Sequence, residues 1–349
     1  MSSLKWYMHP GQYDDVVVSN AIRFARNLEE FDFRDRLSPE DSNKLVGKVR
    51  DLTKIISGHE CTDYYSCNVN KLNDLERESL VEMHVISREL ANKKQATGLI
   101  ISEDESVSIM INEEDHIRIS VVGAGSNIRE TFKIADRIDD YFDSELAYAY
   151  SDRYGYLTTC MSDVGTGMKA SYLLSLPALT MSGKIKAIRD EVGKFGAVIK
   201  EMYGEDDKTA GFMYRITNQK TLGCSEIEII ENLEQVISQI ATLERKRRIN
   251  WIENEHDDVE DKIYRSYGVL RHTKLITCKD AMMLLAQLKL GSDTGLINLA
   301  GNGADIHRLM IEIQPANIRK LYKCDANEND INKARAAYIN EKLPHMRNE

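Results

Sequence analysis

The sequence lacks the residue spacings and long apolar runs that define several common classes of protein. Its six cysteines include no C-x-x-C pair and no combination with histidine that suits a zinc site. The N-terminal stretch has no apolar signal segment, and no window reaches the roughly 18 apolar residues of a membrane-spanning helix. Internal repeats and low-complexity segments are absent as well. We therefore expect a cytoplasmic protein with reduced thiols.

An excess of basic residues is also missing. The 46 Lys and Arg residues face 56 Asp and Glu residues, which gives a net charge of -10. This balance argues against a general binder of nucleic acid or acidic membranes, so any site for a polyanion must be a local basic cluster. What is present is a globular composition, 42% hydrophobic and 29% charged, in a chain of 349 residues that can bury a substantial core.

Hydrophobic periodicity predicts a mixed α+β region followed by a helical one. Ser225 and Glu228 form a capping box that opens a long helix. The charged runs 244–248 and 253–261 then suggest a solvated helix surface or linker, so we expect a catalytic domain over 1–245 and a small helical domain over 246–349. The other expected helices cover 37–56, 72–90, 128–142, 182–198, 263–290 and 306–313, and the expected strands cover 97–102, 107–112, 116–122 and 211–218.

The stretch 154–171, YGYLTTCMSDVGTGMKAS, concentrates groups that suit an anionic ligand. A short strand leads to Cys160, the turn 165–167 offers backbone N–H groups, and Lys169 adds a cation before the helix-like apolar run 172–179. The ordinary alternative is a strand, a turn and a buried helix with an incidental cysteine. Local sequence alone favours that alternative, because short Gly-x-Gly turns are common.

The third expected strand carries ionisable residues beside regularly spaced apolar ones. If the extended conformation reaches back through the preceding acidic turn, Glu114, His116 and Arg118 lie on one face of the sheet. Ordinary cross-strand charge pairs would give the same pattern. Earlier in the chain, Arg23 ends a β-branched run, and its spacing leaves open whether it binds an anion or lies in a solvated loop.

Five stretches together carry a resemblance to a known family: SNAIRFARN, NEEDHIRI, GYLTTCMSDVGTGMKAS, YGE and ITNQKTLGCSE. In this order and spacing they resemble the bacterial protein-arginine kinases, relatives of the phosphagen kinases. The resemblance implies a saddle-shaped antiparallel sheet flanked by helices, ATP with Mg²⁺ as phosphoryl donor, and arginine side chains of proteins as acceptors. It also implies a homodimer with a C-terminal domain that senses phosphoarginine. The implied partners are a zinc-binding activator protein and a Clp-type protease, in stress response and protein quality control.

The resemblance assigns roles to residues of this chain. Glu114 matches the acidic base, which a guanidinium with a pKa above about 12 needs before it can attack a phosphoryl group. Cys160 matches the cysteine that orients the acceptor guanidinium, and nearby cations would favour its thiolate. Arg335 is what remains of the phosphoarginine-binding motif. The residues matched to ATP binding are Ser19, Arg23, His84, Arg118, Lys169, Ala170, Ser171, Lys200, Tyr203, Gly204 and Glu205.

Three positions depart from the motifs of the family. Ala21 replaces the first arginine of S-S-R-I-R, Lys169 that of G-T-G-L-R-A-S, and Lys200 that of R-G-x-Y-G-E. The two lysines keep the charge but lose the planar fork that binds phosphate through two N–H groups. Loss of one such donor typically costs on the order of 10²-fold in rate. The C-terminal motif R-D-x-x-R-A is kept only at Arg335 and Ala336.

The sequence supports two alternative functions. One is an active protein-arginine kinase, if of reduced activity, supported by the retained Glu114, Cys160, Arg118 and Arg23. The other is a catalytically weakened pseudokinase that binds nucleotide or protein as a regulatory subunit, which the substitutions favour. We favour the kinase because the acid–base and thiol positions are intact. A small-guanidine phosphagen kinase is disfavoured, because the first arginine motif appears by residue 23 and leaves no separate N-terminal helical domain.

Overall fold

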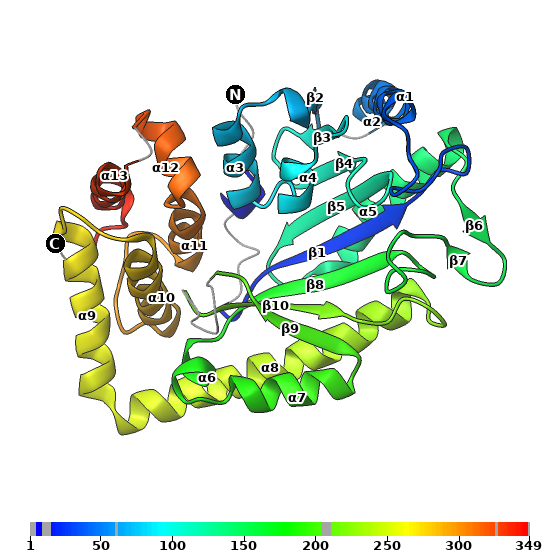
Figure 1. Cartoon of the computed structure of the whole chain (residues 1–349). Coiled ribbons are helices and arrows are strands. Elements are labelled where there is room, and N and C mark those ends of the chain that lie inside the picture. The colour runs from blue at the N-terminus through cyan, green and yellow to red at the C-terminus, as the bar shows by residue number, and fades with distance from the viewer. Residues whose placement is uncertain (1–4, 9–14, 60–61, 204–210, 325–326, 348–349) are drawn as a thin grey trace. The chain divides into compact units, whose positions relative to one another are not determined.

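The computed structural model describes residues 5–8, 15–59, 62–203, 211–324 and 327–347 (Figure 1). Within them an eight-stranded antiparallel sheet has the strand order β2-β3-β4-β5-β1-β8-β10-β9, and β6 and β7 form a separate pair. Helices flank the sheet, so the predicted α+β class is confirmed. The strands are β1 Val17–Arg26, β2 Tyr64–Asn68, β3 Gly98–Ser102, β4 Val107–Ile111, β5 Ile117–Ala124, β6 Tyr150–Ser151, β7 Gly155–Tyr156, β8 Met168–Ser175, β9 Ala197–Glu201 and β10 Met213–Asn218.

The helices mostly begin at the polar caps and prolines of the sequence. Ser38 caps α1, whose first residue is Pro39, and Ser225 and Glu228 form the predicted capping box of α8. The helices are α1 Pro39–Asp51, α2 Thr53–His59, α3 Asp74–Glu82, α4 Arg88–Asn92, α5 Ile128–Glu145, α6 Pro177–Met181, α7 Ile185–Lys194, α8 Glu226–Asn254, α9 His256–His272, α10 Cys278–Thr294, α11 Gly303–Glu312, α12 Pro315–Tyr322 and α13 Glu328–Lys342, with 3-10 turns at Trp6–Met8 and Val69–Lys71.

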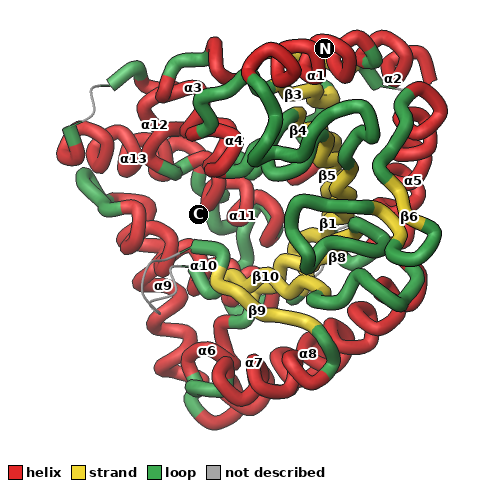
Figure 2. The backbone as a smooth tube through the Cα atoms, turned by 45° about the vertical axis from the view of Figure 1, so that its right-hand side comes forward, coloured by secondary structure: helices red, strands yellow, loops and turns green. Residues whose placement is uncertain are grey.

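The predicted hairpin and third strand are confirmed. Strands β3, β4 and β5 pair antiparallel and lie side by side in both views (Figures 1 and 2). Ile109 faces Ile100 on one neighbour and Ile119 on the other, and all three side chains are fully buried. This alternation of apolar residues favours one register, because a slip by one residue would turn the whole set to the opposite face of the sheet.

The helix expected over 72–90 is wrong as a single element. It ends at Glu82, because His84 adopts a left-handed conformation with φ 60° and the N–H groups of Val85 and Ile86 both bond to the carbonyl of Leu80. A new cap at Ser87 then starts α4. The helix expected over 37–56 is likewise divided between α1 and α2, and that over 263–290 between α9 and α10.

The helix-like run expected over 172–179 is a strand followed by a short helix. Residues Tyr172 to Ser175 continue β8, a central strand of the sheet, and α6 begins at Pro177. Short apolar runs do not distinguish a buried strand from a buried helix. Similarly, the helix expected over 182–198 ends at Lys194, and Gly196, at φ 69°, leads into β9.

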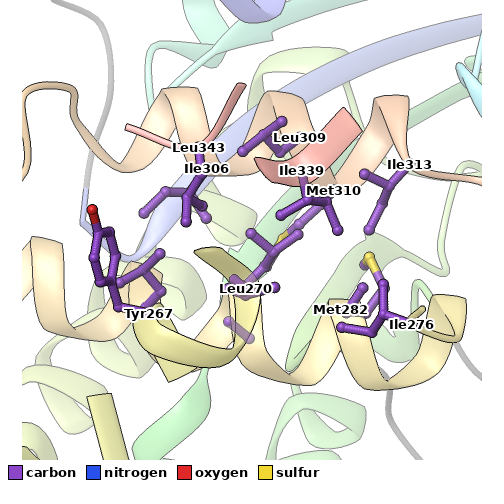
Figure 3. Packing of buried hydrophobic residues seen from close by; sticks show 14 of the residues in the cluster. Tyr267, Leu270, Ile276, Met282, Ile306, Leu309, Met310, Ile313, Ile339 and Leu343 are labelled. Carbon is purple, nitrogen blue, oxygen red and sulfur yellow. The ribbon is translucent and has the colours of Figure 1, made fainter. Parts of the chain in front are cut away.

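The chain divides into two compact units. The first comprises the described residues of Met1–His9, Asn20–Ser171 and Thr217–Glu234, and the second those of Pro10–Ser19, Tyr172–Ile216 and Gln235–Glu349. In the second unit the C-terminal helices share a continuous apolar core that includes Leu270, Met282, Leu309, Ile313 and Ile339 (Figure 3). None of the described helices has the length and apolar character needed to cross a membrane.

The basic run 244–248 is only partly solvated, which differs from the expected surface or linker. Glu244 is fully buried and accepts the N–H groups of Ala178 and Leu179 at 3.0 and 2.9 Å. Arg248, also buried, donates to Glu244 at 2.8 Å. Helix α8 passes through this run without a break, and the Glu244 carboxylate accepts the first N–H groups of α6.

Candidate active site

Glu114 lies in a tight turn between β4 and β5. Asn112 has φ 58°, a conformation that asparagine tolerates, and the N–H of Glu113 bonds to the carbonyl of Asp115 at 3.1 Å. Strand β5 therefore starts only at Ile117, and the extended conformation does not reach back to Glu114. Thr159, which is distant in sequence, stabilises this turn, because its hydroxyl donates a hydrogen bond to the carbonyl of Glu114 at 3.0 Å.

Arg118 joins two neighbouring carboxylates through its planar fork. One nitrogen, Nη1, donates to the buried Glu113, and Nη2 lies 3.2 Å from Glu114 Oε2. The pair predicted between Glu114 and Arg118 is thus present. Glu113 is held further by the hydroxyl of Ser87 and gives an oxygen to the N–H of Glu114 at 2.6 Å. The whole arrangement leaves the Glu114 side chain 27% exposed while Arg118 is buried.

The environment of Glu114 suits a proton acceptor. Burial raises the pKa of its carboxyl, and the neighbouring carboxylates of Asp115 and Glu113 raise it further, against the opposing effect of Arg118. A pKa nearer to neutrality makes a carboxylate a better general base at physiological pH. Arg118 fixes the orientation of the side chain, so the accessible carboxylate oxygen can accept a proton from a group that enters from solvent.

His116 does not share the face of Glu114 and Arg118. Its ring is buried, with Nδ1 accepting the N–H of Leu28 at 3.0 Å and Nε2 lying 3.0 Å from the carbonyl of Asp32. These contacts assign the proton to Nε2. Burial lowers the pKa of His116, so the ring stays neutral at pH 7. The histidine therefore has a structural role in the loop that follows β1.

Cys160 belongs to a chain of polar contacts that leads to two cations. Its Sγ lies 3.0 Å from the hydroxyl of Ser162, which donates to Asp163 Oδ1 at 2.9 Å. The same buried carboxylate is 3.1 Å from Lys169 Nζ and 3.9 Å from an Nη2 nitrogen of Arg23. Asp163 therefore brings the predicted thiol and two predicted phosphate-binding cations into one cluster.

Arg26 shapes the glycine turn behind this cluster. Its buried guanidinium donates to Asp139 Oδ2 at 2.6 Å and to the carbonyl of Thr166 at 3.0 Å, and it lies 3.6 Å from the centre of the Tyr156 ring. Gly167 has φ 63°, and a Cβ there would come within 2.4 Å of Arg26. Only glycine can pass this close to the guanidinium in a left-handed conformation.

The other predicted site residues lie in several elements. Ser19 is buried in β1, Ala170 and Ser171 follow Lys169 in β8, and the N–H of Ala170 bonds to Asn218 at 2.8 Å. His84 is exposed between α3 and α4. In the second unit, Lys200 is exposed in β9 rather than in a loop, and Tyr203 follows it. Gly204 and Glu205 lie outside the described residues.

Arg335, also in the second unit, is engaged inside the protein. It is 1% exposed, and its guanidinium donates to the carbonyls of Ile313 at 2.8 Å and Ile276 at 3.1 Å and to the side chain of Asn332. These contacts join α13 to the residues just before α10 and after α11. Its assignment to phosphoarginine binding stays a prediction.

Sequence reasoning missed four residues that organise the site: Glu113, Thr159, Asp163 and Arg26. Glu113 looked equivalent to its acidic neighbours, and only the turn geometry selects it as the buried partner of Arg118. For Asp163 a signal existed, because a carboxylate between a cysteine and a glycine turn that ends in lysine is an obvious partner for that cation.

The fold and the site together define a guanidino phosphotransferase. Residues 44–247, more than half of the chain, match the family described as ATP:guanido phosphotransferase, C-terminal catalytic domain. Residues 256–349 match the protein-arginine kinase McsB C-terminal domain. A solved structure of duplicated taurocyamine kinase from Schistosoma mansoni has a TM-score of 0.58 and 26% identity over 66% of this chain, which spans about a third (33%) of that chain. Lombricine kinase, at 21% identity and a TM-score of 0.58, shares the fold over 70% of this chain and 71% of its own.

Curated relatives show to which family of guanidino phosphotransferases the chain is similar. The protein-arginine kinase of Caldanaerobacter subterraneus subsp. tengcongensis is 38% identical over 95% of this chain and 98% of its own length. That of Clostridium kluyveri is 37% identical over 94% of each chain. The chain belongs to the protein-arginine kinase family.

Removal of the charge of Asp163 is expected to tighten nucleotide binding. In Asp163→Asn the amide oxygen can still accept from Lys169, but the negative charge beside Lys169 and Arg23 is gone, so less negative charge repels the phosphates. We expect the dissociation constant for ATP to fall roughly fivefold, measured by titration calorimetry. Asp152→Asn, at an exposed residue between β6 and β7, is the control and should bind ATP like the unmodified protein. Weaker binding by Asp163→Asn would show that the carboxylate positions the cations instead.

Proposed function

We propose that this protein transfers the γ-phosphoryl group of ATP to arginine side chains of other proteins, and that it acts in stress response and protein quality control. The observation that carries the proposal is the pairing of Glu114 with Arg118 next to Cys160, since Thr159 bonds to Glu114 and precedes the thiol. A carboxylate, a thiol and a fixed guanidinium are the groups that arginine phosphorylation requires.

Glu114 is the proposed base. It orients the acceptor guanidinium and takes its proton as nitrogen attacks the γ-phosphorus. The new N–P bond forms as the bond from phosphorus to the bridging oxygen breaks, and ADP leaves. Cys160, linked to the hydroxyl of Ser162, orients the other side of the guanidinium. Both groups are within reach of solvent, as a bulky protein substrate demands.

Positive groups are proposed to hold the transferred phosphoryl group. Arg23, Arg118 and Lys169 supply them in the first unit, and the Nε atom of Arg118 is a buried donor without a partner among the described residues. A phosphoryl oxygen would satisfy such a donor, and a fixed cation stabilises the charge of the loose transition state. We further assign ATP contacts to Ser19, His84, Ala170, Ser171, Lys200, Tyr203, Gly204 and Glu205.

Mg²⁺ is proposed to arrive with ATP. Glu89, Glu113 and Glu114 place carboxylate oxygens within 4.8 Å of one another, but Arg118 already bonds to the last two and Arg34 to Glu89. These guanidinium contacts favour phosphate oxygens as the main ligands of the ion, which would neutralise charge on the transferred group.

We propose a catalytic domain over 1–245 and a helical domain over 246–349, and the two matched spans, 44–247 and 256–349, support a boundary there. The helical domain would form a homodimer and sense phosphoarginine, with Arg335 as the retained residue. A cytoplasmic location, a zinc-binding activator protein and a Clp-type protease complete the proposal.

A weakened pseudokinase is the second candidate. Asp163 neutralises Lys169 and lies near Arg23, and Ala21 supplies no cation at all. A regulatory subunit that binds nucleotide without efficient transfer would have these properties.

Detection of phosphoarginine decides between the two. The purified protein is incubated with MgATP and an arginine-rich unfolded protein, and acid-labile phosphoarginine is measured by mass spectrometry, with Glu114→Gln as control. If the protein is an active kinase, the amount of phosphoarginine should be roughly 10²-fold or more above that of the Glu114→Gln control. The pseudokinase predicts no product despite nucleotide binding, and activity gained in the triple variant Ala21→Arg, Lys169→Arg and Lys200→Arg.

A further inference from the structure

A pocket lies beside the candidate active site, in the loop that follows β1. It has a volume of about 460 Å³ and is lined by Phe31, Asp32, Phe33, Asp35, Arg36 and Thr159. This size falls within the range of roughly 300–1,000 Å³ that is common for small-ligand sites. All six residues belong to the first unit.

Two sets of contacts fix the pocket relative to Glu114. The His116 ring packs edge-on against Phe31 and Phe33, with ring centres 6.0 and 6.1 Å apart, and bonds to the carbonyl of Asp32. On the other wall, Thr159 donates to the carbonyl of Glu114 and is followed directly by Cys160. A group in the pocket is therefore next to the residues that would hold an acceptor arginine.

The lining combines aromatic surface with negative charge. Phe31 and Phe33 are half-buried, and Asp32 and Asp35 are exposed, with Lys93 near enough to Asp35 to interact with its charge. Arg36 is the single cation among the described residues of the lining. His116 behind it adds no charge at pH 7, because burial lowers its pKa. The lining as a whole is thus net negative.

A long basic side chain matches this lining. Lysine and arginine pack their apolar stems against aromatic rings while the charged head stays near water and carboxylates. A glutamate or aspartate would meet the carboxylates of Asp32 and Asp35, and like charges at an interface disfavour the wrong partner. An uncharged side chain would gain the aromatic contact alone.

We propose that this pocket binds a lysine or arginine side chain close in sequence to the acceptor arginine, and so selects basic segments of protein substrates. The inference rests on the proposed function, since it names the substrate context of the same site. Asp32 and Asp35 act in it as specificity-determining residues that touch neither ATP nor the acceptor.

Synthetic peptides with one arginine test the pocket. Each position from two residues before to two after the arginine is varied among lysine, alanine and glutamate, and kcat and KM are measured for the unmodified protein and for Asp32→Asn/Asp35→Asn. Asp140→Asn/Asp143→Asn, at exposed residues of α5 outside the pocket, is the control with the same change in charge. Circular dichroism checks that each variant is folded.

At one or more positions, lysine is expected to raise kcat/KM roughly fivefold or more over glutamate, through KM, because contacts made equally before and during reaction change binding alone. This preference should vanish in Asp32→Asn/Asp35→Asn and persist in the control. A preference that is absent, or that survives loss of both carboxylates, would overturn the inference. If no peptide is phosphorylated, the proposed function fails instead, and fluorescence anisotropy of labelled peptides then decides on the pocket by the same comparison of lysine with glutamate.

Discussion

Glu114→Gln is expected to lower kcat/KM for an arginine-containing peptide by roughly 10²–10⁴-fold, because glutamine keeps the shape of the side chain but takes no proton. Arg118 retains its contact with Glu113 in this variant, so the cation remains in place. The dissociation constant for ATP should therefore change by less than about twofold, since the change affects the transition state and spares ground-state binding. Steady-state kinetics and calorimetric titration provide the two measurements.

The matched control for this variant is Glu89→Gln. Glu89 is the third carboxylate of the same group, but it is exposed and pairs with Arg34. Its loss should leave kcat/KM nearly unchanged. Equal activity in Glu114→Gln and the unmodified protein would refute the assignment of Glu114.

The pH dependence of kcat/KM in the unmodified protein and in Glu114→Gln gives a second test of the role of Glu114. Burial raises the pKa of Glu114, so kcat/KM of the unmodified protein should be full above that pKa and fall as the pH drops through it. The fall lies at a higher pH than an ordinary glutamate would give. Glu114→Gln should lack this limb.

Among the substitutions considered, Arg118→Met is expected to lower the free energy of unfolding the most. Methionine fills much of the same volume but leaves Glu113, 1% exposed, as a buried charge without its partner. Breaking a buried pair from one side typically costs about 3–5 kcal/mol. For a domain of this size the melting temperature should fall by roughly 10 °C, as measured by thermal denaturation, and phosphoryl transfer should be lost together with the cation.

A double-mutant cycle separates charge from packing. Adding Glu113→Gln to Arg118→Met removes the unpaired charge, so the double variant should recover about half of the lost stability or more. Arg129→Met is the surface control, because Arg129 pairs with Glu234 through two nitrogens while 49% exposed, and its loss should cost less than about 1 kcal/mol. If Arg118→Met and Arg129→Met lose equal amounts of stability, the buried pair of Arg118 and Glu113 contributes no more to stability than a surface ion pair.

Much of the fold follows from local pattern. Alternating valines and isoleucines predicted β4 and β5, the acidic turn before β4 predicted its hairpin with β3, and a serine and a glutamate three residues apart predicted the start of α8. The failures have local causes too. His84 breaks a helical pattern by taking a left-handed conformation, and the run at Tyr172 is apolar on both faces because β8 is a central strand.

The site was predictable where chemistry is specific to one residue type. Glu114 and Arg118 were expected on one face of an extended strand, but the turn between β4 and β5 is what brings the two side chains into contact. The link from Cys160 to Lys169 through Asp163 was missed, because it depends on a turn whose shape is set by Arg26, far away in sequence. The pocket of Phe31 and Phe33 was missed for the same reason, since its other wall, Thr159, comes from a distant loop.

The buried Arg26 also has a consequence for the order of folding. It bonds to partners 113 and 140 residues further along the chain, Asp139 and Thr166, whereas β3, β4 and β5 are consecutive and pair with close neighbours. Contacts between distant residues form late, because long loops must close first. The hairpin that carries Glu114 can thus assemble early during synthesis, but the turn that carries Cys160 takes its shape only after the ribosome has released the chain well beyond residue 166. A nascent or partly folded molecule would hold the base without the thiol, and activity would arise only with the complete sheet.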